Sequence, residues 1–215
     1  METKARLQIN SSNESLPREA CLPLTYAQRW NSPYDMNGMQ PAVSVFITQP
    51  AYIWTCVHAS NEKEDEVGGA LVGQWCADVQ KKQQFIVIEH MLPARFTKRS
   101  PVHLTFTHES LLEFHRVMEA RFTGKQIVGW YHTHPRMGLF LSSYDTWLHK
   151  YFFPEPWQVA LVIEPHTSVG GFFIRQTNGS LDTARYFGFY ELNGNLGHSL
   201  VRWYNLHRPE EEEGD

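Results

Sequence analysis

Short apolar runs recur along the chain and limit its fold more than any other feature of the sequence. The clearest are VSVFIT (43–48), EVGGALVG (66–73), QFIVIEH (84–90), KQIVGWYHTH (125–134) and WQVALVIEP (157–165). Runs of this length, bounded by polar residues, glycine or proline, are typical of strands buried in a sheet. HLTFT (103–107), GGFFIRQ (170–176) and residues 185–192 predict further strands.

Helix-like patterns separate several of these runs. Residues 51–64 carry Ile53 and Val57 at helical spacing, and a second helix is predicted from near Ser142 to about Phe152. Thr107 can cap a third helix that Gly124 ends. Its predicted buried face is Leu111, Leu112, Phe114, Val117 and Met118. Strands and helices do not alternate regularly, which favours an α+β fold with a central mixed sheet and helices packed on its faces.

The ends of the chain differ in composition from its middle. Residues 1–40 are rich in Ser, Asn and Pro, and we expect a partly ordered extension with one ordered piece near Leu24 to Trp30. Residues 41–205 form the predicted domain, and residues 206–215 an acidic, solvated tail. A stretch rich in Pro, Arg and Lys at 93–101 predicts a loop or flap over the surface.

Composition argues against several classes of protein. The net charge of −4 does not favour binding to nucleic acid. No apolar run approaches the roughly 20 residues of a membrane helix, and METKARLQINSSNESLP lacks the apolar core of a secretory signal. Cys21, Cys56 and Cys76 form no CxxC pair. We therefore expect a cytoplasmic protein without membrane or nucleic-acid partners.

Residues 129–145, GWYHTHPRMGLFLSSYD, contain the candidate functional site. His132 and His134 come at the end of a predicted strand, where alternate side chains point to the same side. A turn into the next helix can bring the carboxylate of Asp145 beside them. Two imidazoles and one carboxylate suit zinc and leave a fourth position open, as catalytic zinc sites do. HxH alone is a weak signal, and a histidine-rich loop would also contain it.

The pattern HxHPxxxxxxSxxD, formed by His132, His134, Pro135, Ser142 and Asp145, resembles the JAMM signature of the MPN-plus metalloproteases. That Mov34/MPN/PAD-type family also has a glutamate in a context like ExxGxLxG, and Glu66 begins EVGGALVG here. The resemblance covers about residues 43–190, and it implies the MPN (cytidine-deaminase-like) fold.

The resemblance also implies a role for each of these residues. His132, His134 and Asp145 would hold one Zn²⁺ per chain. Glu66 would act as general base and then general acid, and Ser142 would donate a hydrogen bond to the developing oxyanion. The other acids of the run before the strand, Glu62, Glu64 and Asp65, fit a solvated helix end. Among the remaining aromatic and histidine residues, Trp130 and Tyr131 fit a core or groove wall, and isolated histidines such as His149 fit surface or helix-face positions.

Members of this family cleave after the C-terminal tail of ubiquitin or ubiquitin-like proteins, so the resemblance implies a deubiquitinase-like isopeptidase acting in deconjugation or precursor processing. A flap over the substrate would make Arg95, Phe96 and Lys98 candidate contacts. Because the chain ends soon after its last predicted strand, we expect a compact enzyme similar to prokaryotic members, some of which work beside E1-like and E2-like enzymes in antiviral defence. Two alternatives stay open: a peptidase that processes sulfur-carrier proteins, and a non-catalytic MPN scaffold.

Overall fold

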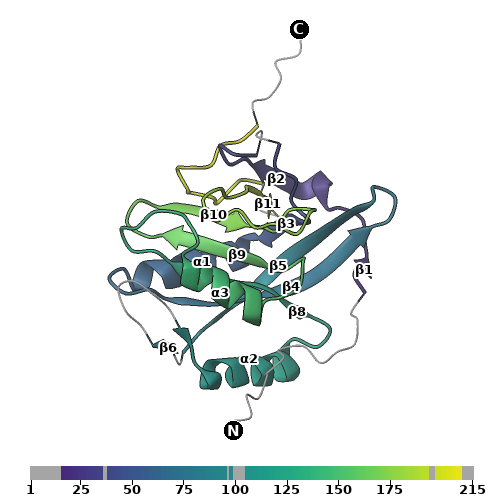
Figure 1. Ribbon diagram of the computed structural model, residues 1–215. Coiled ribbons are helices and arrows are strands. Elements are labelled where there is room, and N and C mark those ends of the chain that lie inside the picture. Colours follow the sequence, from purple (N-terminus) through teal and green to yellow (C-terminus); the bar gives the residue numbers. More distant parts are fainter. Residues whose placement is uncertain (1–15, 36–37, 96, 99–104, 194–196, 210–215) are drawn as a thin grey trace.

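The computed structural model describes residues 16–35, 38–95, 97–98, 105–193 and 197–209. Within these ranges, nine strands form one large sheet, two more form a small hairpin, and three α-helices pack around them (Figure 1). This arrangement confirms the predicted α+β class with a central mixed sheet. None of the helices in the described ranges is long and apolar enough to cross a membrane.

The elements follow one another in the order that the sequence predicts, with additional short strands near the N-terminal end and at Thr97–Lys98, inside the predicted loop 93–101. The α-helices are α1 (Gln49–Asn61), α2 (His108–Arg121) and α3 (Ser143–Phe152), and a 3-10 helix spans Leu24–Tyr26. The strands are β1 (Arg18–Glu19), β2 (Ala27–Trp30), β3 (Ser44–Thr48), β4 (Gly68–Asp78), β5 (Gln83–Pro93), β6 (Thr97–Lys98), β7 (Thr105–Phe106), β8 (Gln126–Thr133), β9 (Val159–Glu164), β10 (Val169–Phe173) and β11 (Phe189–Leu192).

Strand β8 lies inside the large sheet, whose order is β10-β9-β8-β4-β5-β3-β11-β2, with β1 paired to β4. It runs antiparallel to β4 and parallel to β9. A strand covered on both faces is expected to read as a continuous apolar run, as β8 does. At Gly129 an added Cβ would lie 2.3 Å from the carbonyl oxygen of Val159, so glycine allows the close approach of β8 and β9.

Neighbouring residues of β8 show that α1 and α3 pack on opposite faces of the sheet. Trp130 contacts His149 of α3, whereas the next residue, Tyr131, contacts His58 of α1. Successive side chains of a strand point to opposite faces. Figure 1 shows α3 in front of the strands and α2 at the base of the view, below the large sheet. His132 therefore lies on the α3 face.

All three helices begin at a hydroxyl side chain that accepts a backbone hydrogen bond. Thr48 accepts from the N–H of Ala51, Thr107 from Ser110 and Ser142 from Asp145. Such N-caps satisfy donors that have no partner inside the helix. The predicted starts of α2 and α3 are confirmed. Helix α2 ends at Arg121, and Gly124 follows it in the left-handed region with φ of 76°.

Several details differ from the sequence prediction. Helix α1 ends at Asn61, and its Ile53 and Val57 are 40% and 43% exposed, because its buried face consists of other residues. Those residues are Gln49, Ala51, Tyr52, Thr55 and Ala59. Leu112, expected in the buried face of α2, is 46% exposed.

The N-terminal region is also more ordered than we expected. The ordered piece near Leu24 to Trp30 is present, and its strand β2 pairs with β11 at the edge of the large sheet. Strand β1 pairs with the far end of β4. Strands β1 and β2 thus belong to the large sheet, although they lie in the region predicted to be a partly ordered extension. Strand β4 begins at Gly68, two residues after Glu66.

Candidate metal centre

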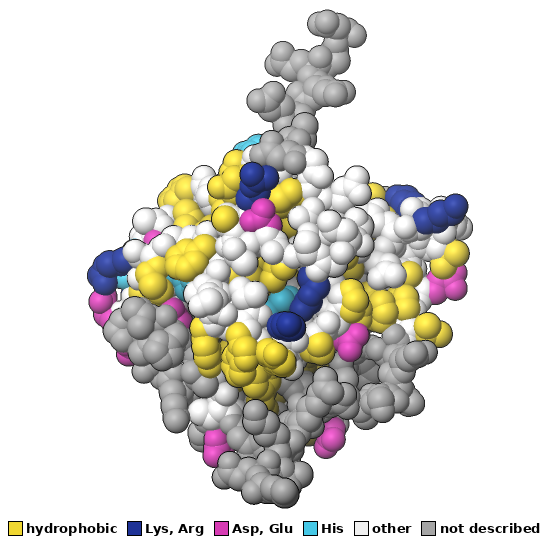
Figure 2. Space-filling view, viewed as in Figure 1, with side chains coloured by type: hydrophobic (Ala, Val, Ile, Leu, Met, Phe, Trp, Pro, Cys, Tyr) yellow, Lys and Arg dark blue, Asp and Glu magenta, His cyan; other side chains and the backbone are white. Residues whose placement is uncertain are grey.

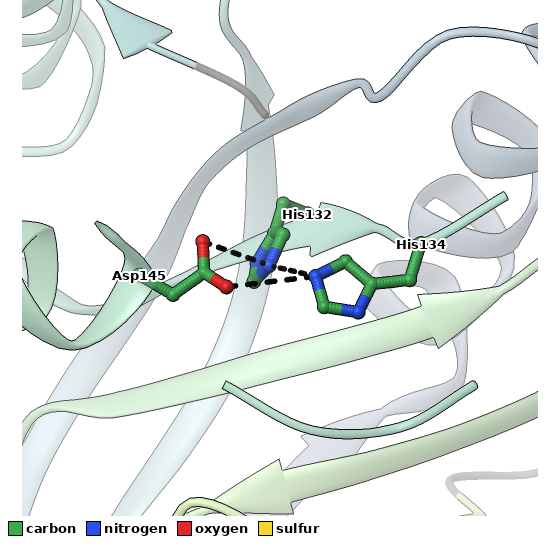
Figure 3. A group of neighbouring side chains, drawn as sticks. All are labelled: His132, His134 and Asp145. Atoms are coloured by element: carbon green, nitrogen blue, oxygen red, sulfur yellow. Dashed lines mark hydrogen bonds and ion pairs between the residues drawn. The ribbon is translucent and has the colours of Figure 1, made fainter. Parts of the chain in front are cut away.

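His132 and His134 reach the same point from the end of β8. The Nε2 atoms of the two rings lie 2.9 Å apart, and both side chains are almost fully buried. His132 Nε2 lies 3.3 Å from Asp145 Oδ1, and His134 Nε2 lies 3.6 Å from Asp145 Oδ2. Figure 3 shows the three side chains pointing toward one another, with Asp145 approaching from α3. His132 and Asp145, thirteen positions apart in the sequence, thus converge through the turn that precedes α3.

Asp145 is held in this position by the first turn of α3. Ser142 Oγ accepts a hydrogen bond from the Asp145 N–H at 3.1 Å, and Asp145 Oδ2 accepts one from the Ser142 N–H at 2.7 Å. This reciprocal pair is a capping box, in which the first and fourth residues of the helix start satisfy each other's backbone groups. The S-x-x-D spacing in the sequence is a signal of such a cap, whereas the family resemblance implies only a catalytic role for Ser142.

Burial and charge act in opposite directions on this cluster. Burial by itself raises the pKa of the Asp145 carboxyl, but its interactions with His132 and its hydrogen bonds with His134 and Ser142 outweigh burial and hold the pKa below its ordinary value. Burial lowers the pKa of His132 more than Asp145 raises it. An ionised carboxylate beside a neutral imidazole is the protonation state that binds a cation.

The donor set fits a divalent zinc-like ion. Among the described residues, His132, His134 and Asp145 are the one group of three or more His, Cys, Asp or Glu whose ligand atoms all lie within 4.8 Å of one another. Two nitrogen donors and one carboxylate oxygen match the ligands of catalytic zinc sites. The other ring nitrogen of His134, Nδ1, lies 3.2 Å from the carbonyl oxygen of Gly138, a contact that orients the ring.

Glu66 lies on the same side of the sheet as the two histidines. Gly68 pairs with His132, and the next residue toward the N-terminus, Val67, exchanges hydrogen bonds of 2.8 and 2.9 Å with Thr133. Alternation along this extended segment then directs Glu66 to the face of His132 and His134. Its side chain is 1% exposed.

The other acids of the run 62–66 lie nearer the surface than Glu66. Glu62 and Glu64 are exposed, and Asp65 is half-buried. Glu64 pairs with Arg136 at 2.8 Å, and this partner lowers the pKa of the Glu64 carboxyl. Burial thus separates Glu66 from the three acids that we expected to be solvated.

The predicted flap residues are only partly placed. Arg95 is exposed, and its Nη1 atom lies 3.5 Å from Oε1 of Glu113 in α2. Phe96 lies outside the described residues, and Lys98 is the last residue of β6, which pairs with β7.

Two contacts beside the cluster were missed from the sequence. Trp130 stacks on His132 with ring centroids 4.5 Å apart, and its indole N–H donates to His149 Nδ1 at 3.1 Å. His149 is fully buried on α3, so of the two expected positions it takes a helix face, one turned to the core, and not the surface. Its spacing of four residues from Asp145 could have indicated a shared helix face.

Fold and site together define a mixed α+β domain with a buried His-His-Asp cluster at the end of an inner strand. Residues 41–153 match the family described as JAB1/Mov34/MPN/PAD-1 ubiquitin protease. The chain belongs to this family, and its fold is the MPN fold.

Similar proteins come from archaea and eukaryotes. An archaeal protein named NAD(+) hydrolase TcpA, from a Theionarchaea archaeon, is 37% identical over 36% of this chain and 24% of its own length. COP9 signalosome complex subunit 5 of Caenorhabditis elegans is 30% identical over 55% of this chain and 32% of its own length. The same subunit of Eremothecium gossypii is 29% identical over 69% and 35%. The chain thus spans between 24% and 35% of the length of these three relatives.

A solution structure of a Desulfitobacterium hafniense protein is also similar, with 22% identity and a TM-score of 0.48. The similarity covers 66% of this chain and 90% of that one.

Proposed function

We propose that this protein is a zinc-dependent isopeptidase or peptidase that cleaves after the C-terminal tail of a ubiquitin-like protein. The buried cluster of His132, His134 and Asp145, with Glu66 directed to the same face, carries the proposal. The family description, ubiquitin protease, supports the choice of substrate class. Both deconjugation and precursor processing use this chemistry.

The residues of the site divide the reaction between them. Zinc held by His132, His134 and Asp145 would act as a Lewis acid and make water nucleophilic near neutral pH. Glu66 would take the proton of the attacking water and deliver it to the leaving amine. Ser142 Oγ accepts the Asp145 N–H, so its own O–H can donate to the oxyanion that forms at the scissile carbonyl.

The surface beside the site supports a protein substrate. Trp147 and Tyr151 of α3 are 46% and 60% exposed, and their rings lie 5.5 Å apart. In Figure 2 hydrophobic side chains gather at the front of the molecule, over the position of α3 in Figure 1. Exposed apolar groups in contact with one another mark interaction surfaces more often than isolated ones do. A tail bound as an added strand, with Arg95 and Lys98 near it, would complete the contact.

We further propose a prokaryotic ubiquitin-like conjugation system as the setting, with E1-like and E2-like enzymes in the cytoplasm and a role in antiviral defence. The similarity to an archaeal protein supports a prokaryotic setting. If the neighbouring genes instead encode enzymes of cysteine or cofactor biosynthesis, they support the alternative hypothesis that the protein is a peptidase that processes sulfur-carrier proteins.

The test is cleavage of ubiquitin-like proteins fused through their C-terminal tails to a reporter. We expect release of the reporter after the tail, abolished by a chelator and by Glu66→Gln. Sulfur-carrier fusions in the same panel distinguish that substrate class. Zinc bound at one ion per chain, without cleavage of any fusion, would contradict the proposed activity and favour a binding module.

A further inference from the structure

The ring of His132 is fixed differently from that of His134. Its Nε2 faces Asp145 and His134, while its Nδ1 is buried and has no hydrogen-bond partner among the described residues. Histidine ligands usually donate their second ring N–H to a carboxylate or carbonyl, which sets the orientation of the ring. His134 has such a contact with Gly138, and His132 has none. Packing must therefore orient His132.

Trp130 supplies that packing. It precedes His132 by two residues on the same face of β8, and the two rings are nearly parallel, at an angle of 9°. The indole is fully buried and also stacks on Phe153, 5.8 Å away at 10°. Phe106 meets the indole edge-on at 5.9 Å. The indole therefore has little freedom to tilt, and neither has the imidazole stacked on it.

His149 fixes the remaining rotation of the indole. An indole nitrogen can only donate, so His149 Nδ1 accepts its hydrogen bond and the proton of the neutral imidazole is on Nε2. Burial, and to a lesser extent the charge of Arg175, lowers the pKa of His149 to about 3, so this state persists at neutral pH. The carbonyl oxygen of His149 accepts from the N–H of Phe153, which ties the residue to the end of α3.

Asp145 and His149 are one helical turn apart on α3. We propose that Trp130 and His149 are positioning residues of the metal centre: His149 holds the indole, and the indole holds the His132 ring with Nε2 directed at the ion. Helix α3 then provides one ligand, Asp145, and orients a second, His132, through His149 and Trp130. This inference rests on the metal centre of the proposed function.

The experiment compares Trp130→Leu and Trp130→Phe with the same changes at Trp157. Trp157 is also buried, at 3% exposure, but it stacks on Trp75 and precedes β9, at the end of the sheet where β8 begins. Zinc affinity is measured by competition with a chromophoric chelator, and ligand geometry by the visible absorption of the Co²⁺-substituted protein. Neither readout depends on a substrate.

We expect Trp130→Leu to raise the Kd for zinc by about 10- to 100-fold, the usual effect of removing a group that orients a ligand, and to change the Co²⁺ spectrum. Trp130→Phe should have a smaller effect because a ring still covers His132. Trp157→Leu should lower Tm yet leave affinity and spectrum as in the wild type. If Trp130→Leu does not fold, His149→Phe, which removes the acceptor of the indole N–H, takes its place and should also weaken zinc binding.

The inference would be overturned if the Trp130 and His149 variants had the same zinc affinity and Co²⁺ spectra as Trp157→Leu. This conclusion would hold whether or not the variants cleave a substrate. Wild-type protein that binds zinc but cleaves no fusion would contradict the proposed function alone. Wild-type protein that binds no zinc would contradict both.

Discussion

Ser142 and Asp145 exchange two hydrogen bonds, each accepting the backbone N–H of the other. The same carboxylate is a candidate metal ligand, so the start of α3 and the metal centre share one group. A ligand carboxylate that also accepts a backbone N–H has its oxygens fixed before the ion binds.

Ser142→Ala is expected to lower both stability and activity. Loss of the N-cap should reduce the free energy of unfolding by about 1 kcal/mol, and loss of the oxyanion donor should slow cleavage about 100-fold. Thr107→Ala is the matched control, since Thr107 caps α2 through the N–H of Ser110. Urea denaturation and kcat measurements on both variants separate the two effects. Equal loss of kcat in both would show that Ser142 acts only as a cap.

Glu66→Gln is expected to reduce kcat by about 100- to 10,000-fold, because the amide cannot accept the proton of water. Zinc content, measured by mass spectrometry, should stay at the wild-type level. Glu64→Gln is the control, since Glu64 lies two residues away, is exposed and pairs with Arg136. If Glu64→Gln lost as much activity as Glu66→Gln, Glu66 would not be the base.

Zinc should raise Tm, and a chelator should lower it without unfolding the protein, because the pairing of β8 with β4 and β9 and the apolar core around it do not depend on the ion. A ligand at 100 times its Kd stabilises the native state by about 2.7 kcal/mol. His134→Ala should abolish the response to zinc while keeping the fold. Differential scanning fluorimetry with zinc, Mg²⁺ and chelator provides the measurement, and a zinc response that survives in His134→Ala would point to binding elsewhere.

Acidification should destabilise the metal-free protein partly through His149. Burial lowers its pKa from 6.5 to about 3, so between these values the unfolded chain binds a proton that the native protein does not. Stability is therefore complete above the unfolded pKa and falls as the pH drops toward the folded one, by up to about 1.4 kcal/mol per pH unit. In His149→Phe this slope should be shallower, as measured by urea denaturation from about pH 7 to about pH 4. An unchanged slope would mean that His149 binds protons equally in the native and unfolded states, so that burial does not lower its pKa.

Arg95→Ala should raise KM for a tail-containing substrate several-fold with little change in kcat, as expected for a residue that contributes only to binding. Because Arg95 lies 3.5 Å from Glu113, Glu113→Gln tests whether this ion pair is responsible. A normal KM in Arg95→Ala would remove Arg95 from the substrate contacts.

The sequence predicts the inner strands and the metal ligands better than the outer elements. Strand β8 is recognisable because it is buried on both faces and therefore apolar throughout. Strand β2, with the sequence AQRW, has no such pattern, since it lies at the sheet edge and its pairing with β11 is set by residues far along the chain. The buried face of α1 is hard to predict because it uses Ala51, Thr55 and Ala59, while larger Ile53 and Trp54 face outward.

The surroundings of the ligands could not be predicted in the same way. An isolated histidine at a helical position, such as His149, gives no sign of burial until Trp130 is placed beside it. The position of Glu66 depends on Val67 and Thr133, whose hydrogen bonds join segments 66 residues apart. Long-range pairing of this kind leaves no mark in local periodicity.

The inner position of β8 also determines how the site responds to local unfolding. Backbone amides of a strand paired on both sides exchange with solvent only when much of the sheet opens, so the segment that carries His132 belongs to the slowest-exchanging part of the protein. Glu66 precedes β4 and adjoins the exposed acids of the loop after α1, and Asp145 lies in the first turn of α3. Asp145 and Glu66 come from segments outside β8, so local opening of either segment would disable the site while the backbone of β8 stays paired.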